Sequence, residues 1–167
     1  MDICLRHTLE SDLGFVLNAE LSDENSPFVI AWTYQQHQQA LSNKDLLHLI
    51  VEQCDNNKPI GYIILAGLEQ NNQSIEFRRI VITDKGKGYG RESLRLIKKM
   101  AFEKLFAHRL WLDVKDRNLR ARHVYEAEGF IVEGVLRECL KIGEKFESLV
   151  VLSMLQSEYQ CYQNQNS

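Results

Sequence analysis

The sequence predicts an α+β fold, a mixed layer of strands and helices with one crossover unit in its middle. Three observations support this prediction. The length of 167 residues is typical of a single domain. Hydrophobic periodicity gives the order strand, two helices, three strands, helix, strand, helix and two strands. The passage from residue 74 to residue 114 is a strand, a glycine-rich loop, a helix and a strand, which demands a right-handed crossover.

The composition is that of an ordered globular protein. Hydrophobic residues make up 44% and charged residues 26%, and there are only 2 Pro and 9 Gly. No apolar run approaches the roughly 20 residues of a membrane span, and residues 1–10 lack the pattern of a secretory signal. We therefore expect a cytoplasmic protein with one domain over residues 1–157 and a flexible, Gln- and Asn-rich tail over residues 158–167.

The first half of the chain predicts a strand, two helices and three further strands. Alternation at Ile3, Leu5 and His7 indicates the first strand, and helical spacing follows from Leu13 to Leu21. Residues 22–28 have loop composition, and a second helix is expected between Thr33 and Leu41. Three β-branched-rich runs, separated by polar turns, predict antiparallel strands in meander order at residues 47–53, 60–68 and 74–83.

The second half predicts two helices and three strands. Apolar residues at steps of three or four over residues 88–106 indicate a long helix whose other face is basic. Residues 109–114 are typical of a buried strand. A further helix spans residues 119–128, with Asn118 as N-cap and Gly129 as its left-handed stop. Two final strands are expected at residues 130–140 and 146–156, around a turn at Gly143.

Cysteines and histidines are dispersed along the chain. No Cys-x-x-Cys pair occurs, and no closely spaced histidine completes a zinc cage. We therefore expect no metal site, and reduced, inert thiols at Cys4, Cys54, Cys139 and Cys161.

Charge is unevenly distributed. Residues 78–122 hold 14 Lys or Arg against 5 Asp or Glu, whereas the remainder holds 6 basic and 18 acidic residues. Such a stretch can mark a site for nucleic acid or for a phosphorylated small molecule, and solvated helix faces explain it equally well. Because the basic residues are interleaved with helix core positions and no RNA-stacking motif is present, we expect no nucleic-acid partner.

Residues 84–91 place three glycines in five positions at the entry to the long helix. A backbone free to take positive φ can turn several N–H groups toward one point, and the helix start adds the positive end of its dipole. This pattern predicts a phosphate or pyrophosphate site. Arg91 stands where a P-loop and a dinucleotide fingerprint each require another glycine, so both are excluded. Charge around the site would come from Lys85, Lys87, Arg91 and Arg95.

The loop Lys85-Gly86-Lys87-Gly88-Tyr89-Gly90 resembles the Gln/Arg-x-x-Gly-x-Gly/Ala loop of the GNAT superfamily of acyl-coenzyme A dependent N-acyltransferases, with Lys at its first position. A second pattern is similar to the family's Asn-x-x-Ala-x-x-x-Tyr-x-x-x-Gly-Phe: Asn118, Ala121, Tyr125, Gly129 and Phe130. The resemblance covers about residues 74–135. It implies a mixed, mostly antiparallel sheet of about six to seven strands, splayed near the middle, with helices on both faces.

The resemblance also implies an N-acetyltransferase domain that uses acetyl-CoA as cosubstrate. The cosubstrate would lie in the splay, paired with the backbone of Ile80, Val81 and Ile82, where the N–H of Val81 would polarise the acetyl carbonyl. Asn118 and Ala121 would contact the other arm of the cosubstrate. The pyrophosphate would be bound by Lys85 and by the loop N–H groups of Lys87, Gly88, Tyr89, Gly90 and Arg91.

Acyl transfer to an amine needs a neutral amine and a protonated or stabilised thiolate. Tyr125 is the candidate general acid, because a phenol titrates at about 10 and a thiol near 8.5; the alternative is a core tyrosine. Glu76 is the candidate base. Alternation places Glu76, Arg78 and Ile80 on one face, so Arg78 can pair with Glu76 and leave proton removal to a chain of waters.

The acceptor is less well defined. Residues 1–77 hold 3 basic and 11 acidic residues, which favours a cationic acceptor: a polyamine, an amino sugar, an amino acid or a protein N-terminus. Solvated acidic surface is the alternative. Aromatic residues at positions 28, 32, 34 and 111 can line a pocket or lie in the core. A non-catalytic acetyl-CoA-binding sensor is the second functional hypothesis, and edge strands together with the resemblance predict a homodimer.

Overall fold

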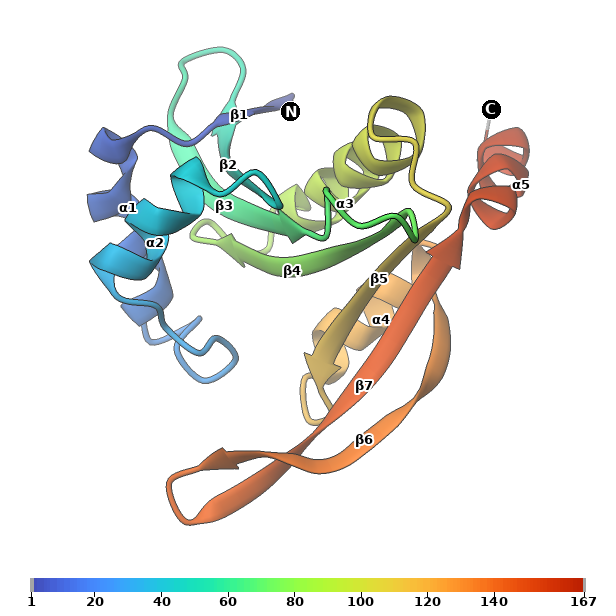
Figure 1. The fold of residues 1–167 in the computed structure, drawn as a ribbon. Helices are drawn as coiled ribbons and strands as arrows, with labels where there is room; N and C mark the ends of the chain where they lie inside the picture. The colour runs from blue at the N-terminus through green and yellow to red at the C-terminus, as the bar shows by residue number, and fades with distance from the viewer. Residues whose placement is uncertain (1, 167) are drawn as a thin grey trace.

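A computed structural model describes residues 2–166, which form one seven-stranded sheet with helices on both faces (Figure 1). The strands are β1 (Ile3–His7), β2 (Leu46–Gln53), β3 (Pro59–Ala66), β4 (Ser74–Ile82), β5 (Arg109–Lys115), β6 (Ile131–Ile142) and β7 (Lys145–Leu155). The helices are η1 (Glu10–Asp12), α1 (Leu13–Leu21), α2 (Tyr34–Ser42), α3 (Tyr89–Lys99), the π-helical turn η2 (Met100–Lys104), α4 (Leu119–Ala127) and α5 (Gln156–Asn166). The predicted α+β class is confirmed.

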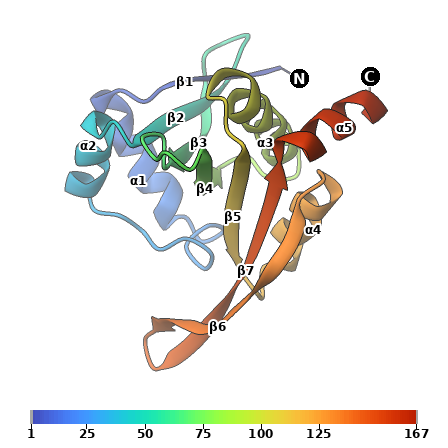
Figure 2. The same cartoon turned by 45° about the vertical axis from the view of Figure 1, so that its right-hand side comes forward.

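The sheet divides at its middle. The strand order is β1-β2-β3-β4-β5-β7-β6, and β4 with β5 is the one parallel pair within residues 2–166. Their ladder contains the pairs Ser74–Arg109, Ile75–Leu110 and Glu76–Trp111, after which the strands separate, as the two views show (Figures 1 and 2). The predicted splay is therefore confirmed, and it lies beyond Glu76.

A β-bulge in β4 sets which side chains face each layer beyond that point. Leu65 of β3 pairs with Phe77 and Ile64 pairs with Arg79, which leaves Arg78 as the extra residue. The bulge reverses the alternation, so Ile80 packs against the same core cluster as Phe77, while Val81 belongs to the opposite cluster. The prediction that Ile80 shares a face with Glu76 is therefore wrong.

Two cores flank the sheet. The larger lies between one face and α3, α4 and α5, and contains Phe77, Leu94, Ile97 and Leu112. The smaller lies between the other face and α1, and contains Val16, Ile50, Tyr62 and Val81. Both cores are supplied by side chains at the helical and strand spacing seen in the sequence.

The chain end is a helix rather than the predicted flexible tail. In α5, Tyr159 is buried and its ring stacks on Phe102 with centroids 4.8 Å apart, while its hydroxyl donates to Glu103 at 2.7 Å. One aromatic anchor thus fixes a segment whose composition indicated disorder. Ser167 lies outside the described residues. No helix within residues 2–166 is long and apolar enough to cross a membrane.

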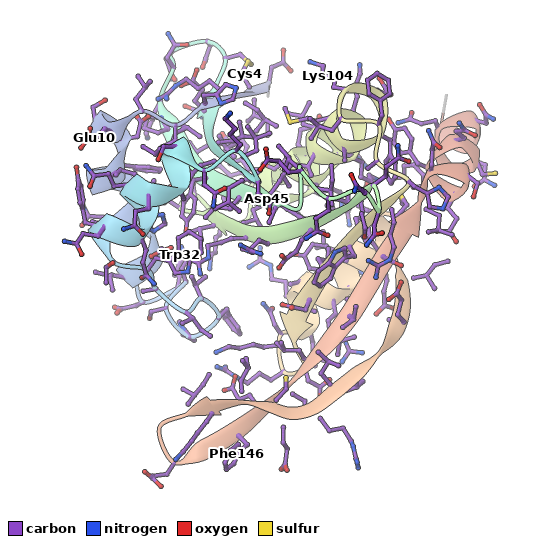
Figure 3. The ribbon with its side chains drawn as sticks, viewed as in Figure 1. Cys4, Glu10, Trp32, Asp45, Lys104 and Phe146 are labelled. Atoms are coloured by element: carbon purple, nitrogen blue, oxygen red, sulfur yellow. A yellow bond between two sulfur atoms is a disulfide. The ribbon has the colours of Figure 1, made fainter. Side chains whose placement is uncertain are left out.

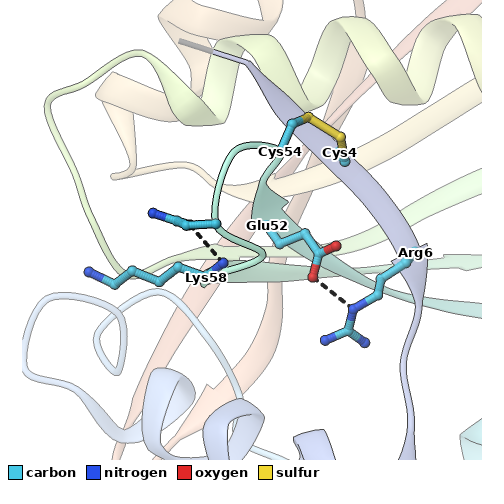
Figure 4. Close-up of a disulfide and its surroundings, with 6 residues drawn as sticks. Cys4, Arg6, Glu52, Cys54 and Lys58 are labelled. Carbon is cyan, nitrogen blue, oxygen red and sulfur yellow. Dashed lines mark hydrogen bonds and ion pairs between the residues drawn. A yellow bond between two sulfur atoms is a disulfide. The ribbon is translucent and has the colours of Figure 1, made fainter.

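The structure corrects the prediction of four reduced thiols. Cys4 and Cys54 form a disulfide although they are 50 residues apart in sequence (Figure 4). Antiparallel pairing of β1 with β2 brings them together, because Cys4 lies opposite Glu52 and the Cys54 N–H donates to the Asp2 carbonyl at 3.0 Å. Sequence spacing carries no signal for adjacency across two strands that are far apart along the chain. Cys139 and Cys161 are free and exposed.

We expect Cys54→Ser to lower the free energy of unfolding by about 2–4 kcal/mol, because the disulfide closes a long loop that contains α1 and α2. Urea unfolding followed by circular dichroism measures this change. Cys139→Ser, at a free and exposed cysteine, is the control and should not alter the midpoint. Equal stability of the oxidised and dithiothreitol-reduced wild type would contradict the expectation.

Candidate active site

The backbone of β4 is open on one side where β5 has separated. The N–H of Thr83 donates to the Ile60 carbonyl, and in the same register Val81 lies opposite Tyr62. Alternation of an antiparallel ladder then turns the N–H and C=O of Val81 toward β3. The polar groups of Ile80 and Ile82 face the opening instead. The N–H of Val81, which was expected to polarise the acetyl carbonyl, is therefore directed away from it.

The glycine-rich loop forms a left-handed turn into α3. Gly86 and Gly88 both have φ of 83°, and Gly88 is the N-cap of α3 without a capping side chain. The N–H groups of the first helical turn have no intrahelical acceptor. Apart from the adjoining residues and the backbone of α3 itself, no atom of residues 2–166 lies within 4 Å of a Cβ built on Gly86, Gly88 or Gly90. Open space over exposed N–H donors fits a pyrophosphate group.

The predicted cations surround this helix start, and each has a protein partner. Lys85 donates to the Glu24 carbonyl at 2.6 Å, and Lys87 donates to Asp84 at 2.9 Å. Arg91 and Arg95 both lie beside Glu128 at the end of α4. The side chains of Lys87 and Arg91 are about half exposed, at 51% and 46%. They can therefore exchange these partners for a phosphate at little cost in buried area.

Helix α4 carries the second motif along the other side of the opening. Asn118 caps the helix through its side-chain oxygen, which accepts from the Ala121 N–H at 3.3 Å. Its amide NH₂ group has no hydrogen-bond partner among the described residues. Gly129 ends the helix with φ of 92°, as predicted.

Tyr125 of α4 is partly buried against the larger core, with its ring centroid 6.1 Å from that of Phe130. Within residues 2–166 its hydroxyl makes no hydrogen bond. Burial and the negative charge of Asp113 on β5 raise the pKa of the phenol to about 12. Tyr125 therefore lies on the face of the larger core, opposite the face of Glu76 and Asp113.

Two carboxylates lie on the opposite face of the opening, that of α1 and α2. Arg78 donates to Glu76 through two nitrogens, at 2.7 and 3.1 Å, which confirms the pairing considered from the sequence. The side chain of Asp113 makes no hydrogen bond or ion pair to any described residue. Burial and the charge of Glu76 raise the pKa of Asp113. Sequence reasoning missed Asp113, although burial of Leu110 and Leu112 puts it on the same face as Trp111.

Residues 22–33, here called the acceptor segment, cross the opening on this face. Arg79 of β4 donates to the Ile30 carbonyl at 2.7 Å, while Lys115 and Arg117, at the end of β5, donate to the Pro27 carbonyl at 3.2 and 2.6 Å. The segment is thus held from both halves of the sheet.

Three of the four candidate aromatic residues lie at this opening. Trp32 lies between α2 and β4 (Figure 3), Phe28 lies under the Arg117 guanidinium, and Trp111 shares the face of Asp113. Tyr34 instead donates to Glu10 at 3.1 Å near the start of α1. Within residues 2–166 no group of three His, Cys, Asp or Glu has the arrangement of a metal site.

Residues 3–131 match the sequence-family model of the acetyltransferase (GNAT) domain, and the chain belongs to this family. It is an acetyl-CoA-dependent N-acetyltransferase that acts on amines.

The similar proteins include two curated spermidine N(1)-acetyltransferases. That of Vibrio cholerae is 25% identical over 94% of this chain and 95% of its own length, and that of Escherichia coli K12 is 26% identical over 93% and 87%. A crystal structure of the Vibrio cholerae spermidine N-acetyltransferase with CoA and spermine has the same fold, with a TM-score of 0.85, 24% identity and coverage of 95% and 98%.

We expect Gly90→Val to abolish tight CoA binding while the protein stays folded. Gly90 lies in α3 without positive φ, and the space beside it is empty, so the new side chain meets only a bound phosphate. Calorimetric titration should show a loss of at least about tenfold in CoA affinity. Gly14→Val in α1, another open helical site, is the matched control. Unchanged affinity in the Gly90 variant would place the pyrophosphate elsewhere.

Proposed function

We propose that this enzyme acetylates a primary amine of a polyamine or similar small cationic amine, with Tyr125 as general acid. The observation that carries the proposal is the arrangement of Tyr125 on one side of the opening and Asp113 with Glu76 on the other. Similarity to spermidine N(1)-acetyltransferases along nearly the whole chain makes spermidine the first acceptor to test.

The proposed cosubstrate site follows the opened edge of β4. The Ile82 carbonyl accepts from the Asn25 side-chain amide at 3.4 Å. The N–H and C=O groups of Ile80 and the N–H of Ile82 would pair with the pantetheine amides as an added strand does. Their N–H groups are also the available donors for the acetyl carbonyl. The first turn of α3 would hold the pyrophosphate, with Lys87 and Arg91 adding charge, and the Asn118 amide would contribute donors from α4.

Tyr125 would donate a proton to the departing thiolate. Because its pKa is raised, the phenol stays protonated at neutral pH and remains a hydrogen-bond donor throughout turnover. No other partner within the described residues competes for that hydroxyl. This favours the role of acid over that of base.

Asp113 would bind the incoming ammonium group, since within residues 2–166 its side chain is unpaired and lies on the same face as Glu76, at the edge of the opening. Glu76 is held by Arg78, so its remaining lone pairs would orient a water that carries the proton away. Glu76 would thus act through a bound water and would not take the proton from the amine directly. Charge recognition would thus come from one carboxylate rather than from the acidic character of the N-terminal half.

Two further predictions from the sequence remain untested. A homodimer is supported by β6, an edge strand that exposes Ile131, Val135 and Leu136. Location in the cytoplasm also stays a prediction.

We expect Tyr125→Phe to lower kcat by about 10²–10⁴-fold, the usual contribution of a positioned acid, while CoA affinity is retained. Stopped assays of thiol release at saturating acetyl-CoA and spermidine measure kcat, and calorimetry measures CoA binding. Because the pKa of Tyr125 is raised to about 12, wild-type kcat should not decline through phenol ionisation between about pH 8 and 10. Unchanged kcat in the variant would remove Tyr125 from the mechanism.

Asp113→Asn should raise the KM for spermidine about tenfold or more, because one ammonium contact is lost, and should leave the KM for acetyl-CoA unchanged. The raised pKa of Asp113 means that its charge is lost at a higher pH than for an ordinary aspartate. On acidification, the spermidine KM of the wild type should therefore begin to rise at a pH above the range in which an ordinary aspartate is protonated. Asp116→Asn, at an exposed residue past the end of β5, is the control. CoA binding without thiol release from any of a panel of polyamines, aminoglycosides, amino acids and peptides would instead indicate a sensor.

A further inference from the structure

A fully buried carboxylate lies beneath the acceptor segment. Glu20 of α1 has no exposed surface and accepts four hydrogen bonds. Tyr62 and Arg79 donate from the sheet, His37 Nε2 donates from α2 at 3.1 Å, and the backbone N–H of Trp32 donates at 3.0 Å. A buried charge is tolerated only with such a full set of partners. This part of the smaller core is therefore organised around one negative charge.

Arg79 connects this charge to the opening. It follows the β4 bulge, its Nη1 donates to Glu20, and its Nη2 donates to the Ile30 carbonyl at 2.7 Å. Its guanidinium lies 4.7 Å from the centroid of the Trp32 ring. Glu20 thus holds the acceptor segment at two backbone points: directly at Trp32 and through Arg79 at Ile30.

Two histidines complete the surroundings of Glu20. His37 Nδ1 lies 3.1 Å from His48 Nε2, and His48 Nδ1 lies 2.8 Å from the Thr8 hydroxyl. Burial lowers the pKa of His48 to about 4, so this imidazole is neutral at neutral pH. Burial alone would raise the pKa of Glu20, but hydrogen bonds from His37 and Tyr62 and the charge of Arg79 hold it below its ordinary value. Glu20 is accordingly ionised.

We propose that Glu20 is a positioning residue that fixes the acceptor segment against β4 and thereby sets the affinity for the amine. The inference rests on the proposed function, because it assumes that the amine enters on this face. Glu20 itself does not touch the amine, since none of its surface is exposed. Its effect comes from preorganisation: a segment already ordered loses less entropy when the acceptor binds.

The β5 end of the segment is held independently. Lys115 and Arg117 bind the Pro27 carbonyl and are both paired with Glu147, at 3.1 and 3.0 Å. Loss of Glu20 should therefore free residues 28–33 without detaching the whole segment.

The test is Glu20→Gln, which keeps the volume and removes the charge that holds Arg79. The spermidine KM should rise at least about tenfold, while kcat at saturating spermidine and the KM for acetyl-CoA stay unchanged. Hydrogen exchange at the amides of residues 28–33 should become at least about tenfold faster. Arg79→Lys is the second variant. It retains a cation beside Glu20, loses the second arm to Ile30 and should shift both readouts in the same direction.

Glu52→Gln is the control. Glu52 of β2 is also buried and accepts from Arg6 at 2.8 Å, at the β1 edge of the sheet. Its replacement should alter neither the spermidine KM nor exchange at residues 28–33. The inference is wrong if folded Glu20→Gln keeps both values, or if Glu52→Gln changes them equally. If the wild type acetylates no amine, the proposed function fails, and exchange at residues 28–33 still decides whether Glu20 positions the segment.

Discussion

The separation of β4 from β5 after three residue pairs is the constraint on which the rest of the site depends. It leaves backbone donors and acceptors of Ile80 and Ile82 without a strand partner in the middle of the sheet, where such groups are ordinarily satisfied. The same separation ends beside the first turn of α3 and gives Tyr125 of α4 access to the β5 edge. If β4 and β5 were paired along their whole length, all of these groups would be buried.

The separation is held open by paired charges rather than by apolar packing alone. Arg78 pairs with Glu76, Arg79 with Glu20, and Lys115 and Arg117 with Glu147. The last three cations also bind carbonyls of the acceptor segment, which spans the two halves of the sheet. Because most charges there are neutralised locally, the proposed recognition of a cationic amine falls to Asp113, a carboxylate whose side chain has no partner among the described residues. Net charge along the sequence is a poor guide to such a site.

Much of the fold could be predicted from the chain because each element carries a local signal. Helical spacing identifies α3, Asn118 and Gly129 mark the ends of α4, and polar turns separate the strands of the meander. The glycine loop is likewise a local pattern, since positive φ at Gly86 and Gly88 is a property of the backbone itself. The errors share one cause. Tyr159 anchoring α5, and the disulfide between Cys4 and Cys54, both depend on contacts between distant segments.

The sequence by itself determined the class of fold, the glycine-rich loop before α3 and the tyrosine-bearing helix, because these follow from periodicity and from residue types at fixed spacing. Only the tertiary structure decided which backbone groups face the opening, because one bulged residue, Arg78, reverses the alternation of β4. It also decided that Glu20, His37 and Arg79, which are far apart along the chain, share one buried charge cluster. Burial and pairing of charges are properties of three-dimensional contacts, and local patterns do not encode them.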